Sequence, residues 1–257
     1  MVESAANSNR FGDSSAPKVP PPKPVPADTI SCRATNPLSL QDDLGKVFLD
    51  ERQAKATTAT RLFRNDELFS AIAKTSLPAF FKNNRSGSYG MWSTGCSSGE
   101  EVYSMAMIAL AEFEKAKRPP LMEAFGTDIN QTRISEARGG VYNRPAKDAM
   151  SQDYWRLLMK HAQLSDHTVQ MGDTLRSLCK FTLFDMRNRP KKHTFHFIVC
   201  NHVLQYYDAP GQRHIIGNLK AVLKPGGHLY LEGITAHGLD GCGLKKLPGA
   251  TNLYAVD

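Results

Sequence analysis

The sequence lacks the paired cysteines that mark a zinc site or a disulfide framework. Its five cysteines are odd in number, widely scattered and never spaced as Cys-x-x-Cys; they are Cys32, Cys96, Cys179, Cys200 and Cys242. Zinc sites and small disulfide-stapled domains both depend on such spacing. We therefore predict free thiols and no bound metal.

Long apolar runs are also missing. The most apolar helical stretch, Val102–Phe113, is interrupted by Tyr, Ser and Glu and is far shorter than the roughly 20 residues that cross a membrane. The first ten residues, MVESAANSNR, have neither a basic start nor an apolar core, so they do not resemble a secretory signal. We expect a soluble, cytoplasmic protein without an integral membrane segment.

The balance of charge is moderately basic. Lysine and arginine number 32 against 25 acidic residues, for a net charge of +7. Such an excess is compatible with an anionic partner such as nucleic acid, a membrane surface or an acidic protein. Because much of the excess is dispersed along the chain, a solvated basic surface is the preferred interpretation, and nucleic acid is not the expected partner.

Composition divides the chain into three parts. Residues 1–40 form a tail rich in proline, with six prolines in Pro17–Pro26, which favours an extended and disordered chain. Residues 41–75 have a helical pattern and are predicted as a short helical cap. The candidate buried positions there are Leu44, Val47, Phe48, Leu62, Phe63, Leu68 and Phe69. Residues 76–257 form the main domain, and the polar stretch at about 143–180 is predicted as an inserted subdomain.

A strand, a glycine turn and a helix follow one another at the start of the main domain. Tyr89–Ser93 is a short apolar strand that runs directly into Gly95–Gly99. The apolar residues that follow recur at helical spacing and define one buried face: Val102, Met105, Ala106, Ala109 and Phe113.

Further strands and helices alternate along the rest of the chain. Met122–Thr127 and Phe195–Val199 are predicted strands, and Gln131–Arg138 is a predicted helix that ends at Gly139-Gly140. After them we predict a helix at His214–Leu223, a tight turn at Lys224–Gly227, a strand at His228–Glu232 and a last edge strand at Asn252–Val256. This alternation indicates an α/β protein with a doubly wound, Rossmann-like sheet.

Polar residues follow three of the predicted strands. In a doubly wound sheet, ligands bind beyond the carboxyl ends of the strands, where Gly95, Asp128 and Asn201 would emerge together. The turn carries Glu100 and Glu101 and no lysine, which disfavours a triphosphate. Asp128 is placed to bind ribose hydroxyls, with capping of the next helix as the alternative. The two glutamates have an alternative role in stabilising the helix N-terminus through its dipole.

Four segments, in order, resemble the CheR-type chemotaxis receptor methyltransferases. Thr60–Arg64 (TRLFR) resembles Thr-x-Phe-Phe-Arg, and Gly95–Glu101 (GCSSGEE) resembles Gly-Cys-Ser-Thr-Gly-Glu-Glu. Thr127–Ile129 matches Thr-Asp-Ile, and Cys200–Asp208 (CNHVLQYYD) resembles Cys-Arg-Asn-Val-x-Ile-Tyr-Phe-Asp. The resemblance covers about residues 60–256 and implies transfer of a methyl group from S-adenosylmethionine to receptor glutamates, with S-adenosylhomocysteine as the product.

The resemblance also implies roles for individual residues. Arg64 and Tyr206 would flank the reacting centre as catalytic residues. The cofactor would be bound by Thr60, Arg64, Gly95, Cys96, Glu101, Asp128, Asp185, Met186, Asn201 and His202. These roles suit the chemistry, because a glutamate with an ordinary pKa of about 4.3 is already an anion at neutral pH. An arginine fork and a phenolic donor can then orient it without a general base.

Three positions depart from the family's pattern. Asn201 and His202 replace an arginine and an asparagine, and Asp185 replaces an asparagine. The helical region before the first motif is also shorter than in the family. Two alternatives therefore stay open beside methylation of a chemoreceptor-like protein. One is methylation of another acceptor, such as a small carboxylic acid or nucleic acid, and the other is a non-catalytic sensor or scaffold that binds S-adenosylmethionine.

Overall fold

A computed structural model of the protein describes residues 60–83, 87–190, 194–235 and 237–256. The predicted proline-rich tail, Cys32 and the helical positions Leu44, Val47 and Phe48 lie outside these residues. None of the helices in the described ranges is long and apolar enough to cross a membrane. The four described cysteines are free thiols, and Cys96, Cys179 and Cys200 are buried.

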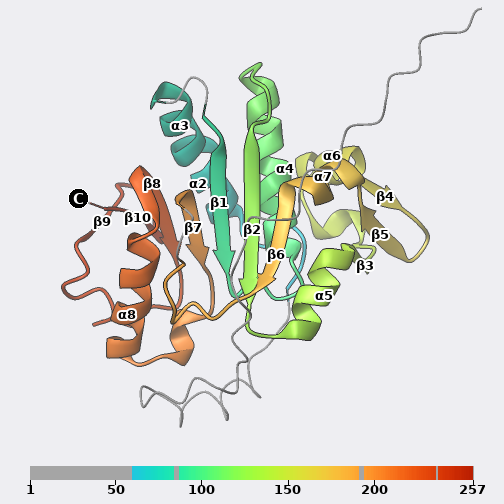
Figure 1. The fold of residues 1–257 in the computed structure, drawn as a ribbon. Helices are drawn as coiled ribbons and strands as arrows, with labels where there is room; N and C mark the ends of the chain where they lie inside the picture. The colour runs from blue at the N-terminus through green and yellow to red at the C-terminus, as the bar shows by residue number, and fades with distance from the viewer. Residues whose placement is uncertain (1–59, 84–86, 191–193, 236, 257) are drawn as a thin grey trace, which may run out of the picture. The chain divides into compact units, whose positions relative to one another are not determined.

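The main domain is built on a sheet of five parallel strands, with two short strands added at one edge (Figure 1). Its order is β6-β2-β1-β7-β8-β10-β9, so the chain moves outward from β1 in both directions. β10 runs antiparallel to both of its neighbours. The strands are β1 (Tyr89–Thr94), β2 (Met122–Asp128), β6 (Cys179–Leu183), β7 (Phe195–Cys200), β8 (Leu223–Leu231), β9 (Leu244–Lys246) and β10 (Leu253–Val256). The predicted doubly wound sheet is thus confirmed, with its switch point between β1 and β7.

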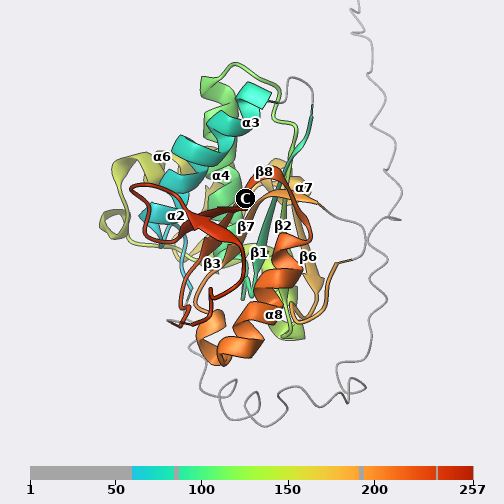
Figure 2. The same ribbon diagram turned by 90° about the vertical axis from the view of Figure 1, so that its left-hand side faces the viewer.

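Helices cover both faces of this sheet (Figures 1 and 2). One face packs against α2 (Asp66–Ala71), the π-helical turn η1 (Ile72–Ser76), α3 (Leu77–Asn83), α4 (Glu100–Lys115), α5 (Gln131–Gly139) and α7 (Asp173–Leu178). The other face packs against α8 (Ala209–Lys220). A hydrophobic core lies on each face of the sheet. Neighbouring residues of β1 point to opposite faces, so Met91 packs in the core beneath α4 and Trp92 in the core beneath α8.

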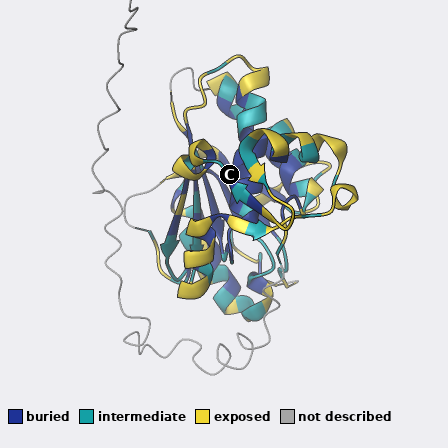
Figure 3. Ribbon diagram, turned by 90° about the vertical axis from the view of Figure 1, so that its right-hand side faces the viewer, coloured by how far each residue is buried: buried dark blue, intermediate teal, exposed yellow. Residues whose placement is uncertain are grey.

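Helix α4 buries the face that its sequence predicts. All five predicted core positions of this helix are at most 2% exposed. Figure 3 shows the strands mostly in the colour of buried residues and the outer sides of the helices as exposed. The helix therefore fixes the orientation of the glycine turn that precedes it.

A small subdomain is inserted between α5 and α7. Its strands form a separate antiparallel sheet in the order β3-β5-β4. Its elements are β3 (Val141–Asn143), the 3-10 turn η2 (Lys147–Ala149), α6 (Gln152–His161), β4 (Ala162–Leu164) and β5 (Thr168–Met171). The predicted insertion at about 143–180 extends too far, because Cys179 already belongs to β6. β6 (CKFTL) alternates apolar and polar residues, but over only five positions, which is too short to stand out after the polar stretch before it.

Four local predictions differ from the structure. The helix predicted at His214–Leu223 is α8, which begins at Ala209 and ends at Lys220, before β8. Residues 60–65 are not helical, and α2 begins only at Asp66 after the N-cap Asn65. Lys224–Gly227 is not a separate turn but an irregular part of β8, where the pairing with β7 shifts between Phe195 and Phe197. The strand at the chain's end is present as β10, yet β9 covers it, so it is not an edge strand.

Candidate functional site

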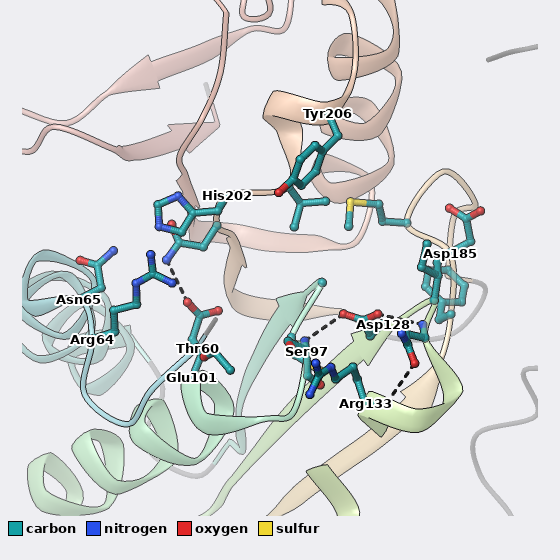
Figure 4. Close-up of a pocket in the computed structure, with 18 of the residues that line it drawn as sticks. Thr60, Arg64, Asn65, Ser97, Glu101, Asp128, Arg133, Asp185, His202 and Tyr206 are labelled. Atoms are coloured by element: carbon teal, nitrogen blue, oxygen red, sulfur yellow. Dashed lines mark hydrogen bonds between the residues drawn. The ribbon is translucent and has the colours of Figure 1, made fainter. Parts of the chain in front are cut away.

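A cavity of about 460 Å³ lies at the carboxyl ends of β1, β2 and β7. Figure 4 shows Arg64, Glu101 and His202 at one end, Asp128, Arg133 and Asp185 at the other, and Ser97 and Tyr206 between them. Every residue that the sequence predicts for the site lines this cavity: Thr60, Arg64, Gly95, Cys96, Glu101, Asp128, Asp185, Met186, Asn201, His202 and Tyr206. Segments more than 100 residues apart in the sequence are therefore brought together at the switch point.

The glycine turn needs the backbone freedom that its sequence provides. Gly95 has φ 68° and Gly99 has φ 92°, both in the left-handed region. A Cβ on Gly95 would lie 2.4 Å from Cγ2 of Val203, so a larger residue has no room there. Burial raises the pKa of the Cys96 thiol well above its ordinary value, which keeps the thiol neutral in this turn.

Glu101 is held by two neutral donors. Its Oε1 accepts from Ser93 Oγ at 2.7 Å, and its Oε2 accepts from Asn201 Nδ2 at 2.9 Å. Burial raises the pKa of Glu101, while the hydrogen bonds from Asn201 and Ser93 oppose that rise. Glu100 and Glu101 both lie in the first turn of α4, but of the two only Glu101 lines the cavity. A helix-dipole role alone does not account for its side-chain contacts.

Asp128 is oriented by backbone donors on both sides. Its Oδ2 accepts from the Ser97 N–H at 2.9 Å and its Oδ1 from the Asn130 N–H at 2.9 Å. The cap of α5 is Asn130, whose Oδ1 accepts from the N–H groups of Thr132 and Arg133. The alternative of Asp128 as the helix cap is therefore wrong, and its carboxylate stands at the end of β2 facing the cavity.

Arg64 reaches the cavity from the segment before α2. Tyr206 reaches it from the 3-10 turn η3 (Leu204–Tyr206), which follows β7. Arg64 is exposed and Tyr206 is half-buried. His202 also follows β7, with a left-handed φ of 57° that is uncommon outside glycine. Its Nε2 lies 3.7 Å from Oε2 of Glu232. The same Glu232 oxygen accepts from Asn65 Nδ2 at 3.3 Å, next to Arg64 in the chain.

Asp185 is already engaged within the protein. Its Oδ1 accepts from the Arg187 backbone N–H at 2.9 Å, and its Oδ2 from Arg187 Nε at 2.7 Å. A carboxylate offers more than two acceptor positions, so it can still meet a further donor. As a predicted cofactor residue, Asp185 therefore has to share its carboxylate between the cofactor and Arg187.

Sequence reasoning missed other residues of the cavity wall, among them Arg61, Asn65, Ser97, Arg133, Phe184 and Val203. Asn65 could have been found, because an asparagine before Asp66-Glu67 is typical of a helix N-cap. Phe184 was missed together with β6, which it follows. No local signal marks Ser97, whose left-handed φ of 50° is decided by the turn as a whole.

The wall suits a ligand with cationic and hydroxyl groups. The side-chain oxygens Ser97 Oγ and Asn201 Oδ1 are buried without a hydrogen-bond partner among the described residues. Such atoms gain most from a polar ligand. The carboxylates Glu101 and Asp128 can meet an amino group and ribose hydroxyls, while Phe184, Met186 and Val203 provide apolar surface for a base. The residues present therefore fit S-adenosylmethionine.

Fold and site together define a Rossmann-like α/β protein of the class that binds S-adenosylmethionine. The model of the family described as CheR methyltransferase, SAM binding domain, matches residues 58–234. The chain belongs to this family.

Individual relatives agree with this. The chemotaxis protein methyltransferase Cher2 of Pseudomonas putida KT2440 is 30% identical over 183 residues, which cover 69% of this chain and 66% of that protein. The chemotaxis protein methyltransferase of Escherichia coli K12 is 28% identical over 179 residues, which cover 68% and 59%. The chain thus spans about two thirds of the length of these relatives or slightly less.

Among solved structures, a TehB-like SAM-dependent methyltransferase from Corynebacterium glutamicum is 11% identical, with a TM-score of 0.41 over 79% of this chain and 90% of that one.

Within the described ranges, no cluster of three His, Cys, Asp or Glu side chains is placed to hold a metal ion.

Proposed function

We propose that the protein transfers the methyl group of S-adenosylmethionine to a glutamate side chain of a chemoreceptor-like protein. The observation that carries this proposal is that Arg64 and Tyr206 line the same cavity as the predicted cofactor residues Glu101 and Asp128. The relatives named above as chemotaxis protein methyltransferases support it. A chemoreceptor-like partner with its acceptor glutamates on the cytoplasmic side would also require this protein to act in the cytoplasm.

The cofactor, when bound, supplies a methyl group on a positively charged sulfur. A carboxylate oxygen of the acceptor would form the new bond to the methyl carbon as the carbon–sulfur bond breaks, leaving a methyl ester and a neutral thioether. No proton has to be removed, because glutamate is ionised at neutral pH. The protein's contribution is therefore orientation and exclusion of water.

Arg64 is the group best suited to orient the acceptor. Its planar guanidinium can donate two parallel hydrogen bonds to a carboxylate. Tyr206 adds a phenolic donor from the other wall of the cavity. Glu101 and Asp128 would hold the amino group and the ribose of the cofactor, so that Arg64, although also predicted to contact the cofactor, would supply only a small part of the cofactor affinity.

The departures at positions 201 and 202 are compatible with a working cofactor site. Asn201 donates directly to Glu101, so the amide keeps this carboxylate in place. His202 and Glu232 form a pair beside Asn65, which precedes α2. These contacts favour a binding-competent site over one that has lost its cofactor residues.

Transfer of labelled methyl groups tests the proposal. The protein is incubated with S-adenosylmethionine labelled in the methyl group and a membrane fraction that contains candidate receptors, and the products are treated with alkali. Label released as volatile methanol is the expected result, because methyl esters are hydrolysed. Base-stable label would indicate another acceptor, and cofactor binding without any transfer would favour the sensor or scaffold.

A further inference from the structure

The inserted subdomain, residues 141–171, contacts both halves of the site through two tyrosines. Tyr142 on β3 donates its hydroxyl to the Ser98 carbonyl at 2.8 Å. Tyr154 on α6 stacks on Phe63, with ring centroids 4.7 Å apart and an interplanar angle of 8°. Ser98 belongs to the glycine turn, and Phe63 directly precedes Arg64. The subdomain therefore touches the cofactor turn and the acceptor segment separately.

Phe63 is held in a conformation that needs support. Its φ of 53° lies in the left-handed region, which is strained for a non-glycine residue and persists only where surrounding contacts hold it. Its N–H donates to Ser104 Oγ at 2.9 Å, and its ring also meets Phe69 edge-on at 5.9 Å. Tyr154 closes this cluster, because it stacks on Phe63 and meets Phe69 edge-on at 5.7 Å. The backbone at Phe63 decides the direction in which Arg64 leaves the chain.

Tyr142 contacts the glycine turn on the cofactor side of the cavity. Burial raises the pKa of its hydroxyl, so the group remains a protonated donor. The Ser98 peptide that it binds lies between Ser97, whose N–H donates to Asp128, and Gly99, whose N–H donates to the Cys96 carbonyl. A fixed Ser98 carbonyl therefore helps to keep the Ser97 N–H directed at Asp128.

We propose that Tyr142 and Tyr154 are positioning residues through which the inserted subdomain controls the two halves of the site. Tyr142 sets the cofactor turn and hence the affinity for S-adenosylmethionine. Tyr154 sets the direction of Arg64 and hence the rate of transfer once the cofactor is bound. The second half rests on the proposed function, since it uses the role given there to Arg64.

The test measures cofactor affinity and turnover separately. Calorimetry gives the Kd for S-adenosylmethionine and the number of binding sites, and transfer to receptor membranes gives kcat per occupied site. Tyr142→Phe should weaken cofactor binding by about two- to tenfold, as expected for loss of one hydrogen bond, with kcat nearly unchanged. Tyr154→Ala should lower kcat by about tenfold or more with the Kd within about twofold, because misplacement of a reacting group is costly. Tyr154→Phe keeps the stack on Phe63, loses only the hydroxyl's contact with Asp66, and should restore most of kcat.

Matched controls come from the opposite end of β1. Tyr89→Phe also removes a buried tyrosine hydroxyl, which bonds to Ser76 Oγ at 2.7 Å. Phe81→Ala also removes a partly buried ring, which packs on Phe113 at 5.0 Å. Both controls should leave Kd and kcat per occupied site as in the wild type. If each control changes these values as much as its tyrosine counterpart, the two tyrosines have only a structural role and the proposal is overturned.

A double variant tests the route through Arg64. Arg64→Lys combined with Tyr154→Ala should lose little more activity than Arg64→Lys alone, because both changes disturb one interaction. Fully additive losses would contradict a route through Arg64. Hydrogen exchange gives a readout independent of transfer, since Tyr154→Ala should speed amide exchange at residues 62–65 and Phe81→Ala should not. A wild-type protein that transfers no methyl group would refute the proposed function, while the Kd and exchange results would still decide whether the tyrosines position the site.

Discussion

Asn201 donates its side-chain amide to Glu101 Oε2 at 2.9 Å. This contact joins the end of β7 to the first turn of α4, across the switch point of the sheet. Asn201 is also one of the positions where the sequence analysis expects a departure from the motif that the chain resembles. The hydrogen bond shows that an amide at this position can take part in holding the carboxylate of the cavity, because it favours the charged form of Glu101 against the effect of burial.

Replacement of Arg64 by alanine should abolish transfer and leave most of the cofactor affinity. The guanidinium is proposed to orient the acceptor carboxylate, and Arg64→Lys should retain a small part of the activity because an ammonium lacks the planar fork. Methyl transfer and calorimetric binding of S-adenosylmethionine check this. An equal loss of binding and transfer in Arg64→Ala would rule out the role of Arg64 as an acceptor-orienting group.

The pH dependence of cofactor binding should follow Glu101. Burial raises its pKa, so the folded protein holds a proton that the unfolded chain has already released. The resulting stabilisation of the apo-protein is present below the ordinary glutamate pKa and is lost as the pH rises through the raised pKa. The affinity for S-adenosylmethionine should rise as the pH rises through the raised pKa of Glu101, because the ionised Glu101 carboxylate attracts the amino group of the cofactor.

Glu101→Gln should remove this rise, as measured by calorimetry across a pH series. The matched control is Glu100→Gln, because burial also raises the pKa of Glu100 but its side chain does not line the cavity. The control should keep the wild-type pH profile of binding. A Glu101→Gln variant with an unchanged profile would show that another group is responsible.

Substitution of Gly95 by alanine should weaken cofactor binding at least about tenfold. The left-handed backbone at position 95 costs an alanine about 1–2 kcal/mol. The new methyl group would also clash with Cγ2 of Val203. Gly241→Ala is the control, because Gly241 has a similar φ of 71° but open space around its Cβ position. That variant should lose some stability and no affinity, and Gly95→Ala combined with Val203→Ala should recover part of the binding.

A buried methionine of α4 should contribute far more to stability than an exposed methionine of α6. Met105→Ala should lower the free energy of unfolding by about 2 to 5 kcal/mol, because the side chain is fully buried against the sheet. Met159→Ala should change it by less than about 0.5 kcal/mol, since Met159 is 52% exposed. Urea denaturation followed by circular dichroism measures both. Similar losses in the two variants would mean that α4 is less tightly packed than the structure indicates.

Regular segments of the fold could be predicted from the sequence because their patterns are strong. The face of α4, the end of α5 at Gly140 and the fully buried strand β7 all follow from local spacing. β6 is not predicted although Cys179–Leu183 alternates apolar and polar residues, because an alternation over five residues is a weak signal without the neighbouring strand β2. The composition of Lys224-Pro-Gly-Gly227 predicts a turn, and only its pairing with β7 makes this segment the irregular start of β8.

The sequence by itself determined the chemistry that this protein carries. A glycine turn with two glutamates and no lysine and a carboxylate after the second strand predict a nucleoside site. The resemblance carried by the motifs around Arg64 and Tyr206 implies that its ligand is S-adenosylmethionine. Only the tertiary structure decided how the site is held. The bond from Asn201 to Glu101, the left-handed backbone at Phe63 and the contacts of Tyr142 and Tyr154 join segments far apart in the chain. No local pattern specifies such contacts, because they depend on how the sheet and the inserted subdomain pack together.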